Sequence, residues 1–145
     1  MSLTMFASYT VHIDAPPEKV WGMMTDVERW PEFAAQFRSI VRKDQGPLAL
    51  GSKARVTPRG LFGSIWQVTE FEASRSFTWE ADALPGLHLV AGHVVEPEGA
   101  GSRVILSLES SGALATLLAP VLGVISRRPR QVGEGLKAYF EGRAP

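Results

Sequence analysis

The chain has 145 residues, and 45% of them are hydrophobic, which fits one globular domain with a sizeable core. Its 15 lysine and arginine residues balance 15 aspartate and glutamate residues, so no net charge favours nucleic acid or an anionic surface as a partner. With no cysteine, the chain can form no disulfide, thiol nucleophile or cysteine-ligated metal site. We therefore expect a single domain over residues 1–145.

Targeting and membrane-spanning segments are not expected. Residues 1–5 are too short for the hydrophobic region of a signal peptide. The longest apolar run, residues 112–126, is interrupted by Pro120 and Gly123. It is also shorter than a membrane-spanning helix, which needs about 20 residues. These features predict a cytoplasmic protein without stable membrane insertion.

The first predicted elements are a strand and a short helix. Residues 6–13 alternate in polarity and are rich in β-formers, which predicts a strand. Asp14 is expected to cap the helix, because Pro16 and Pro17 follow where a first turn tolerates missing N–H groups. The apolar face of this helix is expected to comprise Val20, Trp21, Met23 and Met24.

The end of this helix is predicted from a proline. Pro31 disfavours the α region at Trp30, so the helix should end by about Asp26. We expect a second short helix over residues 32–36, with Trp30 at the hinge between the two helices.

Six further strands are predicted, separated by turn sequences rich in glycine, proline and serine. Their hairpin spacing indicates an antiparallel meander, which makes seven strands with the first one. The predicted ranges are 39–42, 51–58, 63–72, 77–82, 87–96 and 103–110.

The alternation of side chains predicts which strand face points into the core. The assignment is ambiguous in the strand 63–72, where Trp66 and Val68 favour one face and Ile65 and Phe71 the other. The side chains predicted to point inward are Trp66, Val68, Phe77, Trp79, Ala81, Leu89, Ala91, His93, Val95, Val104, Leu106 and Leu108.

The C-terminal part of the chain has helical periodicity that two prolines disturb. Since an interior proline removes a backbone hydrogen bond, we expect a short helix first, a kink or break near Pro129, and a final helix over residues 130–141. Gly133 and Gly135 are expected to weaken this last helix by about 1 kcal/mol each relative to alanine.

Several motifs occur in an order that is typical of one family. The most specific is Ile13-Asp-Ala-Pro-Pro-Glu-Lys-Val-Trp21, and the weaker ones are Asp26-x-x-x-Trp30-Pro31, Gly92-His93-x-x-Glu96-Pro97, Gly101-Ser-Arg-Val104, Ser111-Gly112-Ala-Leu114 and Gly135-Leu136-Lys137. The chain thereby resembles the START-like helix-grip (SRPBCC) superfamily and, within it, the bacterial polyketide cyclase/dehydrase-like branch. The resemblance implies an α+β helix-grip fold, in which a seven-stranded curved antiparallel sheet wraps a long C-terminal helix. It also implies two small helices after the first strand and an apolar cavity between sheet and helix.

The three histidines do not predict a metal site. His88 and His93 fall on opposite faces of one strand, and His12 lies opposite the apolar residues of another. His93 points inward, where it could act as an acid/base group or simply hydrogen bond to a neighbouring strand. The second interpretation is favoured, because no carboxylate has an obvious place beside it.

The ligand contacts are expected from the inward strand faces and the C-terminal helix. The expected ligand-binding residues are Trp66, Val68, Phe77, Trp79, Leu89, Ala91, His93, Leu106, Leu118, Leu122 and Leu136. The basic cluster Arg127-Arg128-Pro129-Arg130 could contact an anionic head group, a partner or a membrane surface, but a solvated helix face is the favoured interpretation.

Three functions remain open. The leading hypothesis is binding of a small hydrophobic ligand, such as a lipid, a quinone or an aromatic polyketide-like molecule, because no convergent acid/base pair is found. One alternative is a polyketide cyclase, aromatase or dehydratase that uses His93 as its catalytic acid/base. The other is an interaction subunit whose cavity is filled by its own side chains. No cofactor and no nucleic-acid partner are expected, and the oligomeric state stays open, a homodimer included.

Overall fold

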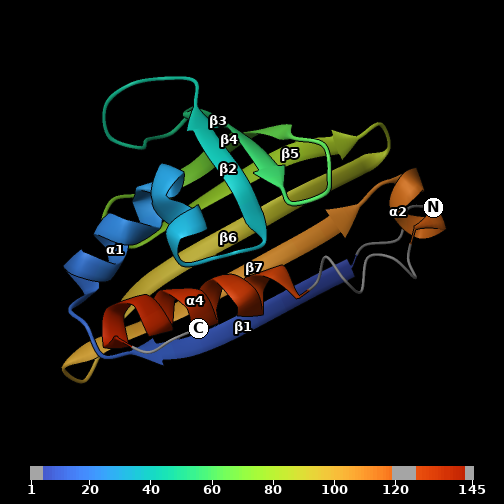
Figure 1. Ribbon diagram of the computed structural model, residues 1–145. Coiled ribbons are helices and arrows are strands. Elements are labelled where there is room, and N and C mark those ends of the chain that lie inside the picture. Colours follow the sequence, from blue (N-terminus) through green and yellow to red (C-terminus); the bar gives the residue numbers. More distant parts are fainter. Residues whose placement is uncertain (1–4, 119–126, 143–145) are drawn as a thin grey trace.

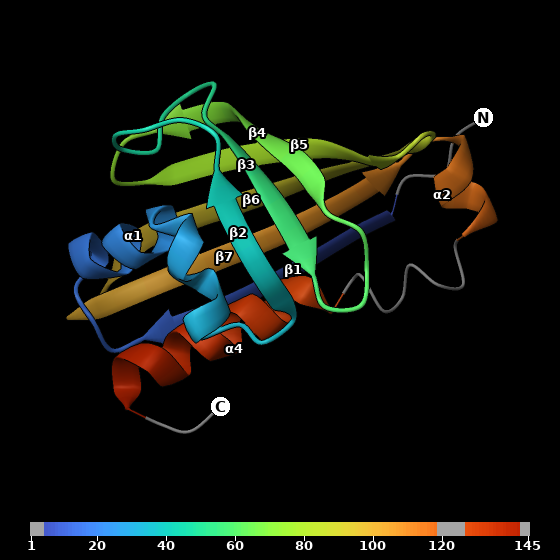
Figure 2. The same ribbon diagram turned by 45° about the horizontal axis from the view of Figure 1, so that its top comes forward.

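Seven strands form one antiparallel sheet in the computed structural model, which describes residues 5–118 and 127–142 (Figure 1). The strand order is β1-β7-β6-β5-β4-β3-β2, so the predicted meander is confirmed and β1 pairs with the last strand. The sheet twists so strongly that β2 and β3 run obliquely to β1 and β7 (Figure 2). The strands are β1 (Met5–Ile13), β2 (Phe37–Arg42), β3 (Lys53–Pro58), β4 (Ser64–Glu72), β5 (Ser76–Leu84), β6 (Leu87–Glu98) and β7 (Gly101–Ser111).

Within residues 5–118 and 127–142, four helical segments accompany the sheet. They are α1 (Pro17–Thr25), the 3₁₀ helix η1 (Val27–Glu32), α2 (Ala113–Leu117) and α4 (Arg128–Glu141). Helix α4 lies along β1 and β7, and α1 and η1 lie on the same side of the sheet (Figures 1 and 2). This arrangement is the helix-grip fold expected from the sequence, including the two small helices after the first strand. In the described part of the chain, every helix is too short or too polar to cross a bilayer.

The start of α1 differs from the prediction. Pro16, not Asp14, is the N-cap residue, and no side chain caps this helix end. Asp14 instead accepts a hydrogen bond at 2.9 Å from the imidazole of His12, and its backbone N–H donates to Glu141 at 3.1 Å. The carboxylate of this aspartate is therefore engaged by a neighbour on β1, and its backbone N–H by a residue of α4, instead of the helix start.

The second helix also lies elsewhere than predicted. It is a 3₁₀ helix over Val27–Glu32 rather than a helix over residues 32–36, although α1 does end at the predicted place. Pro31 lies inside this helix, where the tighter 3₁₀ geometry replaces the α region that proline disfavours at Trp30. Trp30 is 2% exposed and donates its indole N–H to the backbone oxygen of Met24 at 3.1 Å. It is thus a core residue rather than a hinge.

Pro129 lies at the start of a helix, which agrees with the predicted break near this residue. It occupies the first turn of α4, where a missing N–H costs nothing, so the helix starts two residues before the predicted range 130–141. Residues 119–126, on which the middle of the predicted C-terminal helical region falls, lie outside the described part of the chain.

The two glycines of α4 permit close packing. A Cβ atom on Gly135 would lie 1.9 Å from the backbone oxygen of Phe33, and one on Gly133 would lie 2.8 Å from the ring of Tyr9. Their absent side chains therefore let α4 approach β1 and the segment after η1. Close packing, not helix propensity, therefore decides the residue at these two positions.

The predicted inward faces are confirmed, and a β-bulge explains the ambiguous strand. On β4, Trp66 and Val68 are 5% and 1% exposed, whereas Ile65 is 37% exposed. The pairing of β4 with β5 shifts register between Val68 and Glu70, which returns Phe71 to the inner side, where it packs against Trp21.

Candidate ligand-binding cavity

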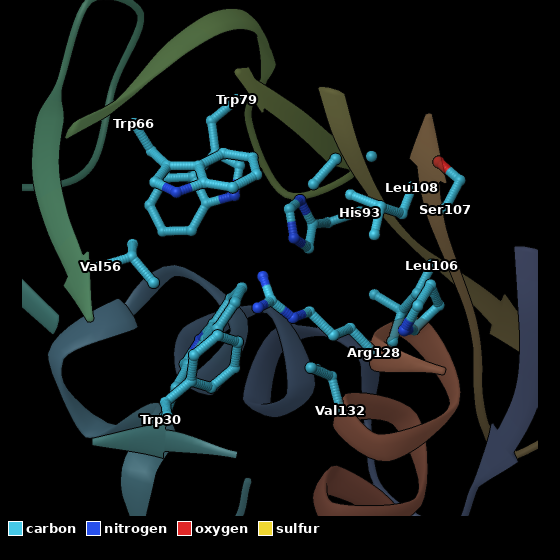
Figure 3. A pocket seen from close by; sticks show the side chains of 14 residues that line it. Trp30, Val56, Trp66, Trp79, His93, Leu106, Ser107, Leu108, Arg128 and Val132 are labelled. Atoms are coloured by element: carbon cyan, nitrogen blue, oxygen red, sulfur yellow. The ribbon is translucent and has the colours of Figure 1, made fainter. Parts of the chain in front are cut away.

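A partly open cavity of about 50 Å³ lies between the sheet and the first turns of α4 (Figure 3). Its wall comes from η1, from strands β2 to β7 and from α4. It is lined by Trp30, Phe37, Val56, Trp66, Trp79, Ala91, Gly92, His93, Leu106, Ser107, Leu108, Arg128, Pro129 and Val132. The lining is largely apolar and aromatic, as in small-molecule sites, with a small number of polar groups.

Three tryptophans form the aromatic side of this cavity. The ring centroids of Trp30 and Trp79 are 5.5 Å apart, and those of Trp66 and Trp79 are 5.7 Å apart. Trp66 and Trp79 come from neighbouring strands, whereas Trp30 is brought opposite them by η1. Rings at these separations provide flat apolar surfaces that suit an aromatic or polyene ligand.

His93 lies beside Trp30 and Trp79, at ring-centroid distances of 5.4 Å and 6.0 Å, with its own ring parallel to that of Phe77. The ring centroids of His93 and Phe77 are 4.2 Å apart with an interplanar angle of 14°. Its Nδ1 donates to the backbone oxygen of Phe77 at 3.1 Å, since a carbonyl can only accept. Burial lowers the pKa of His93 to about 4 and outweighs this hydrogen bond. The imidazole is therefore neutral at pH 7, and its Nε2 carries a lone pair.

Arg128 reaches into the same cavity from the first turn of α4. Figure 3 shows its side chain extending toward His93, with Trp30 on one side and Trp66 and Trp79 beyond the guanidinium. The side chain is half-buried, and this burial lowers the pKa of the guanidinium. Arg128 and His93 thus make one end of an otherwise apolar space polar.

The sequence-predicted residues divide between the cavity and the surrounding core. Leu118 is partly buried against the core, and Leu122 lies outside the described residues. The cavity lining includes Trp66, Trp79, Ala91, His93 and Leu106. The buried core around it includes Val68, Phe77, Leu89 and Leu136.

Sequence reasoning missed three kinds of lining residue. Trp30 was placed at a hinge, and its inward position depends on the 3₁₀ geometry of η1. Phe37 lies outside the predicted strand 39–42, and Val56 carries no signal beyond strand alternation. Arg128 did carry a signal, because Arg128, Val132 and Leu136 are spaced four residues apart on one helix face, and Val132 and Leu136 are buried.

The other two histidines lie on the outside, as predicted. His12 lies within 2.7 Å of Glu98 and 2.9 Å of Asp14, and hydrogen bonds to these carboxylates raise its pKa. His88 lies 2.9 Å from both Asp82 and Glu80, which raise its pKa in the same way. Over the described ranges, no group of three or more histidine, aspartate or glutamate side chains is arranged to hold a metal ion.

A second hollow opens on the surface beside α1. It has a volume of about 470 Å³ and is lined by Trp21, Gly22, Thr25, Asp26, Arg42, Gly46, Pro47, Leu48, Phe71 and Ala73. It is larger than the cavity under α4 and somewhat more open to solvent, and Trp21 and Phe71 are its aromatic side chains. The cavity under α4 has more aromatic side chains and also contains Arg128 and His93, so it is the better candidate site.

Comparison with known proteins agrees with the fold. The sequence model of a family described as "Polyketide cyclase / dehydrase and lipid transport" matches residues 7–141. No curated protein matches the chain by sequence. A hypothetical protein from Helicobacter pylori has a similar structure, with a TM-score of 0.80 and 21% identity over 94% of this chain and 88% of that protein.

Two similar structures carry functional names. The di-domain ARO/CYC protein BexL from the BE-7585A biosynthetic pathway has a TM-score of 0.76 and 18% identity, over 98% of this chain and 52% of BexL. A truncated norcoclaurine synthase from Thalictrum flavum has a TM-score of 0.71 and 12% identity, over 95% of this chain and 94% of that protein. At these identities the likeness concerns the fold alone.

Proposed function

The chain belongs to the polyketide cyclase/dehydrase and lipid transport family, and we propose that it binds a small hydrophobic ligand between the sheet and α4. The candidate ligand classes are a lipid, a quinone and an aromatic polyketide-like molecule. The observation that carries the proposal is the cavity walled by Trp30, Trp66 and Trp79, because stacking on these rings and removal of apolar surface from water supply affinity without catalytic groups.

The size of the cavity sets a condition on binding. Its volume is about 50 Å³, whereas sites for drug-sized ligands measure roughly 300–1,000 Å³. A ligand of two fused rings therefore requires the surrounding side chains to move apart. Arg128 is the lining side chain best suited to move, since no hydrogen bond to any described residue holds its guanidinium. The small volume also favours a second candidate, an interaction subunit whose cavity is filled by its own side chains.

Catalysis by His93 receives less support from the geometry. A general acid or base works best when its pKa lies near the working pH, and burial holds the pKa of His93 at about 4. Its Nδ1 is already engaged by Phe77. A cyclase or aromatase-type reaction would therefore need the ligand itself to change the environment of His93.

Fluorescence of N-phenyl-1-naphthylamine, a neutral dye that brightens in apolar surroundings, tests the binding proposal. We expect saturable enhancement with the wild-type protein. Ala91 lines the cavity, so Ala91→Leu should weaken dye binding by about tenfold, because the larger side chain occupies the ligand's space. The control is Val90→Phe, which adds bulk to the opposite face of the same strand and should leave dye affinity unchanged.

Circular dichroism of both variants establishes that they are folded. If the wild type does not bind the dye, the filled-cavity alternative is favoured instead. If Ala91→Leu and Val90→Phe bind the dye as the wild type does, the ligand does not occupy this cavity. Native mass spectrometry of protein purified from cells adds a direct search for a retained small molecule.

A further inference from the structure

The Arg128 side chain is a half-buried cation without a counter-ion in the described structure. No hydrogen bond or ion pair joins its guanidinium to any residue of the ranges 5–118 and 127–142. The five N–H donors of an arginine lose hydration on burial, and unpaired burial of a charge is costly. Two neighbouring arginines, Arg127 and Arg130, are exposed, so the inward position of Arg128 is specific to that residue.

Further donors in the cavity wall also lack acceptors. Trp66 and Trp79 are only 5% and 3% exposed, yet neither indole N–H donates to any of the described residues. By contrast, the indole of Trp30 is satisfied by the backbone oxygen of Met24. Neither indole nitrogen is among the fully buried polar atoms without a partner, so both are accessible, and an acceptor on a ligand in the cavity can pair with them.

His93 adds a single acceptor to this surplus of donors. Its Nδ1 is engaged by Phe77, which leaves the Nε2 lone pair as the acceptor. Figure 3 shows the guanidinium of Arg128, the imidazole of His93 and the indoles of Trp66 and Trp79 around one common space. A neutral hydrocarbon ligand would leave all these polar groups unpaired, which lowers affinity.

The position of Arg128 on α4 makes an anion still more favourable. The first turn of this helix contains no acidic residue, and its free N–H groups carry partial positive charge. Arg127, Arg128 and Arg130 add three formal positive charges at this end of the helix. A bound anion would offset the repulsion that Arg128 experiences here.

We propose that the ligand carries an anionic oxygen group, a carboxylate or an ionised enol or phenol, on its apolar body, and that Arg128 binds this group inside the cavity. Trp66 and Trp79 donate to the same or a neighbouring oxygen, and His93 accepts from a hydroxyl if the ligand has one. This inference rests on the proposed function and names the chemical class of its ligand. The planar guanidinium fork suits two oxygens of a carboxylate.

A pair of matched probes tests the proposal by calorimetry. Naphthalene-2-carboxylate and naphthalene-2-carboxamide have nearly the same shape and differ in charge. We expect the wild type to bind the carboxylate about tenfold or more tightly than the amide, which is the range of a charge-assisted hydrogen bond. Arg128→Met should remove this preference while keeping the affinity for the amide, and Arg128→Lys should restore part of it.

Arg127→Gln is the control, because it removes an exposed charge one residue away. It should leave both affinities unchanged. The carboxylate preference should also fall only slightly between low and high salt, since a buried pair is weakly screened.

The outcomes separate this inference from the proposed function. Equal binding of both naphthalene probes, or loss of the preference in Arg127→Gln rather than Arg128→Met, overturns the role of Arg128 and leaves hydrophobic binding intact. Binding of N-phenyl-1-naphthylamine without binding of the carboxylate also overturns the role of Arg128 and leaves hydrophobic binding intact. If none of the three probes binds, the proposed function itself fails.

Discussion

The imidazole of His93 lies parallel to the ring of Phe77, with centroids 4.2 Å apart, and donates a hydrogen bond to the backbone oxygen of the same residue. The two residues face each other across paired strands, Phe77 on β5 and His93 on β6. This double contact fixes the orientation of the imidazole and directs its remaining nitrogen away from Phe77, while burial keeps the ring neutral.

A pH-dependent loss of stability follows from this burial. Because the pKa of His93 is about 4 in the folded protein and 6.5 in the unfolded chain, the unfolded chain gains a proton first as the pH falls. His93→Gln removes this titration. Relative to this variant, the wild type should lose about 2 kcal/mol of unfolding free energy between pH 7 and pH 5. Urea unfolding at the two pH values measures the difference, and equal pH profiles would contradict the burial of a neutral imidazole.

His88 should give the opposite dependence. Hydrogen bonds to Asp82 and Glu80 raise its pKa above 6.5 in the folded protein. Its stabilising contribution is therefore fully present below pH 6.5 and is lost as the pH rises through the folded pKa. In the same urea experiment, His88→Asn should destabilise the protein more at pH 6 than at pH 9. If the destabilisation by His88→Asn grew with pH, the carboxylates of Asp82 and Glu80 would not stabilise the charged form of His88.

Removal of the unpaired Arg128 should stabilise the protein in the absence of ligand. Arg128→Met keeps the length of the side chain and places an apolar group among Trp30, Val132 and Leu106. We expect the free energy of unfolding to rise by about 1 kcal/mol, because no partner in the described structure is lost. Arg127→Met, at an exposed position, should change it by less than about 0.5 kcal/mol. Destabilisation by Arg128→Met would mean that the guanidinium is paired in the free protein.

Alanine should be destabilising at Gly135 although it favours helices in general. The new Cβ would lie 1.9 Å from the backbone oxygen of Phe33, so α4 must move away from the segment after η1. We expect a loss of about 3 kcal/mol in unfolding free energy. Gly22→Ala in α1 is the control, because no atom lies within 4 Å of its Cβ position, and it should add about 0.5–1 kcal/mol. A similar gain at Gly135 would show that α4 does not pack this closely.

The strands were predictable because their signals are local. Alternation placed Phe77, Trp79 and His93 on the inner face, and all three are 5% exposed or less. The helix-grip fold followed from the order of motifs across the chain. The capping prediction for Asp14 failed, because its carboxylate pairs with His12 and its backbone N–H with Glu141 on a distant helix, a contact that no local pattern contains. The bulge after Val68 likewise appears only when two strands are paired.

The cavity was less predictable than the fold. Its lining includes Trp30, whose position depends on a 3₁₀ helix, and Arg128, whose basic neighbours suggested a solvated face. Helical spacing from the buried Val132 and Leu136 would have placed Arg128 inward. The close approach at Gly135 needed knowledge of Phe33 on a distant segment, which no local pattern contains.

The most direct test of ligand binding under α4 uses the tryptophan side chains as reporters. The chain has four tryptophans, and their indole N–H signals can be followed in a ¹H–¹⁵N spectrum and assigned by Trp→Phe variants. Trp66 and Trp79 line the cavity under α4, whereas Trp21 lines the surface hollow beside α1. Titration with naphthalene-2-carboxylate should shift the signals of Trp66 and Trp79 and leave that of Trp21 unchanged. A shift of Trp21 alone, or no shift at all, would contradict binding in this cavity.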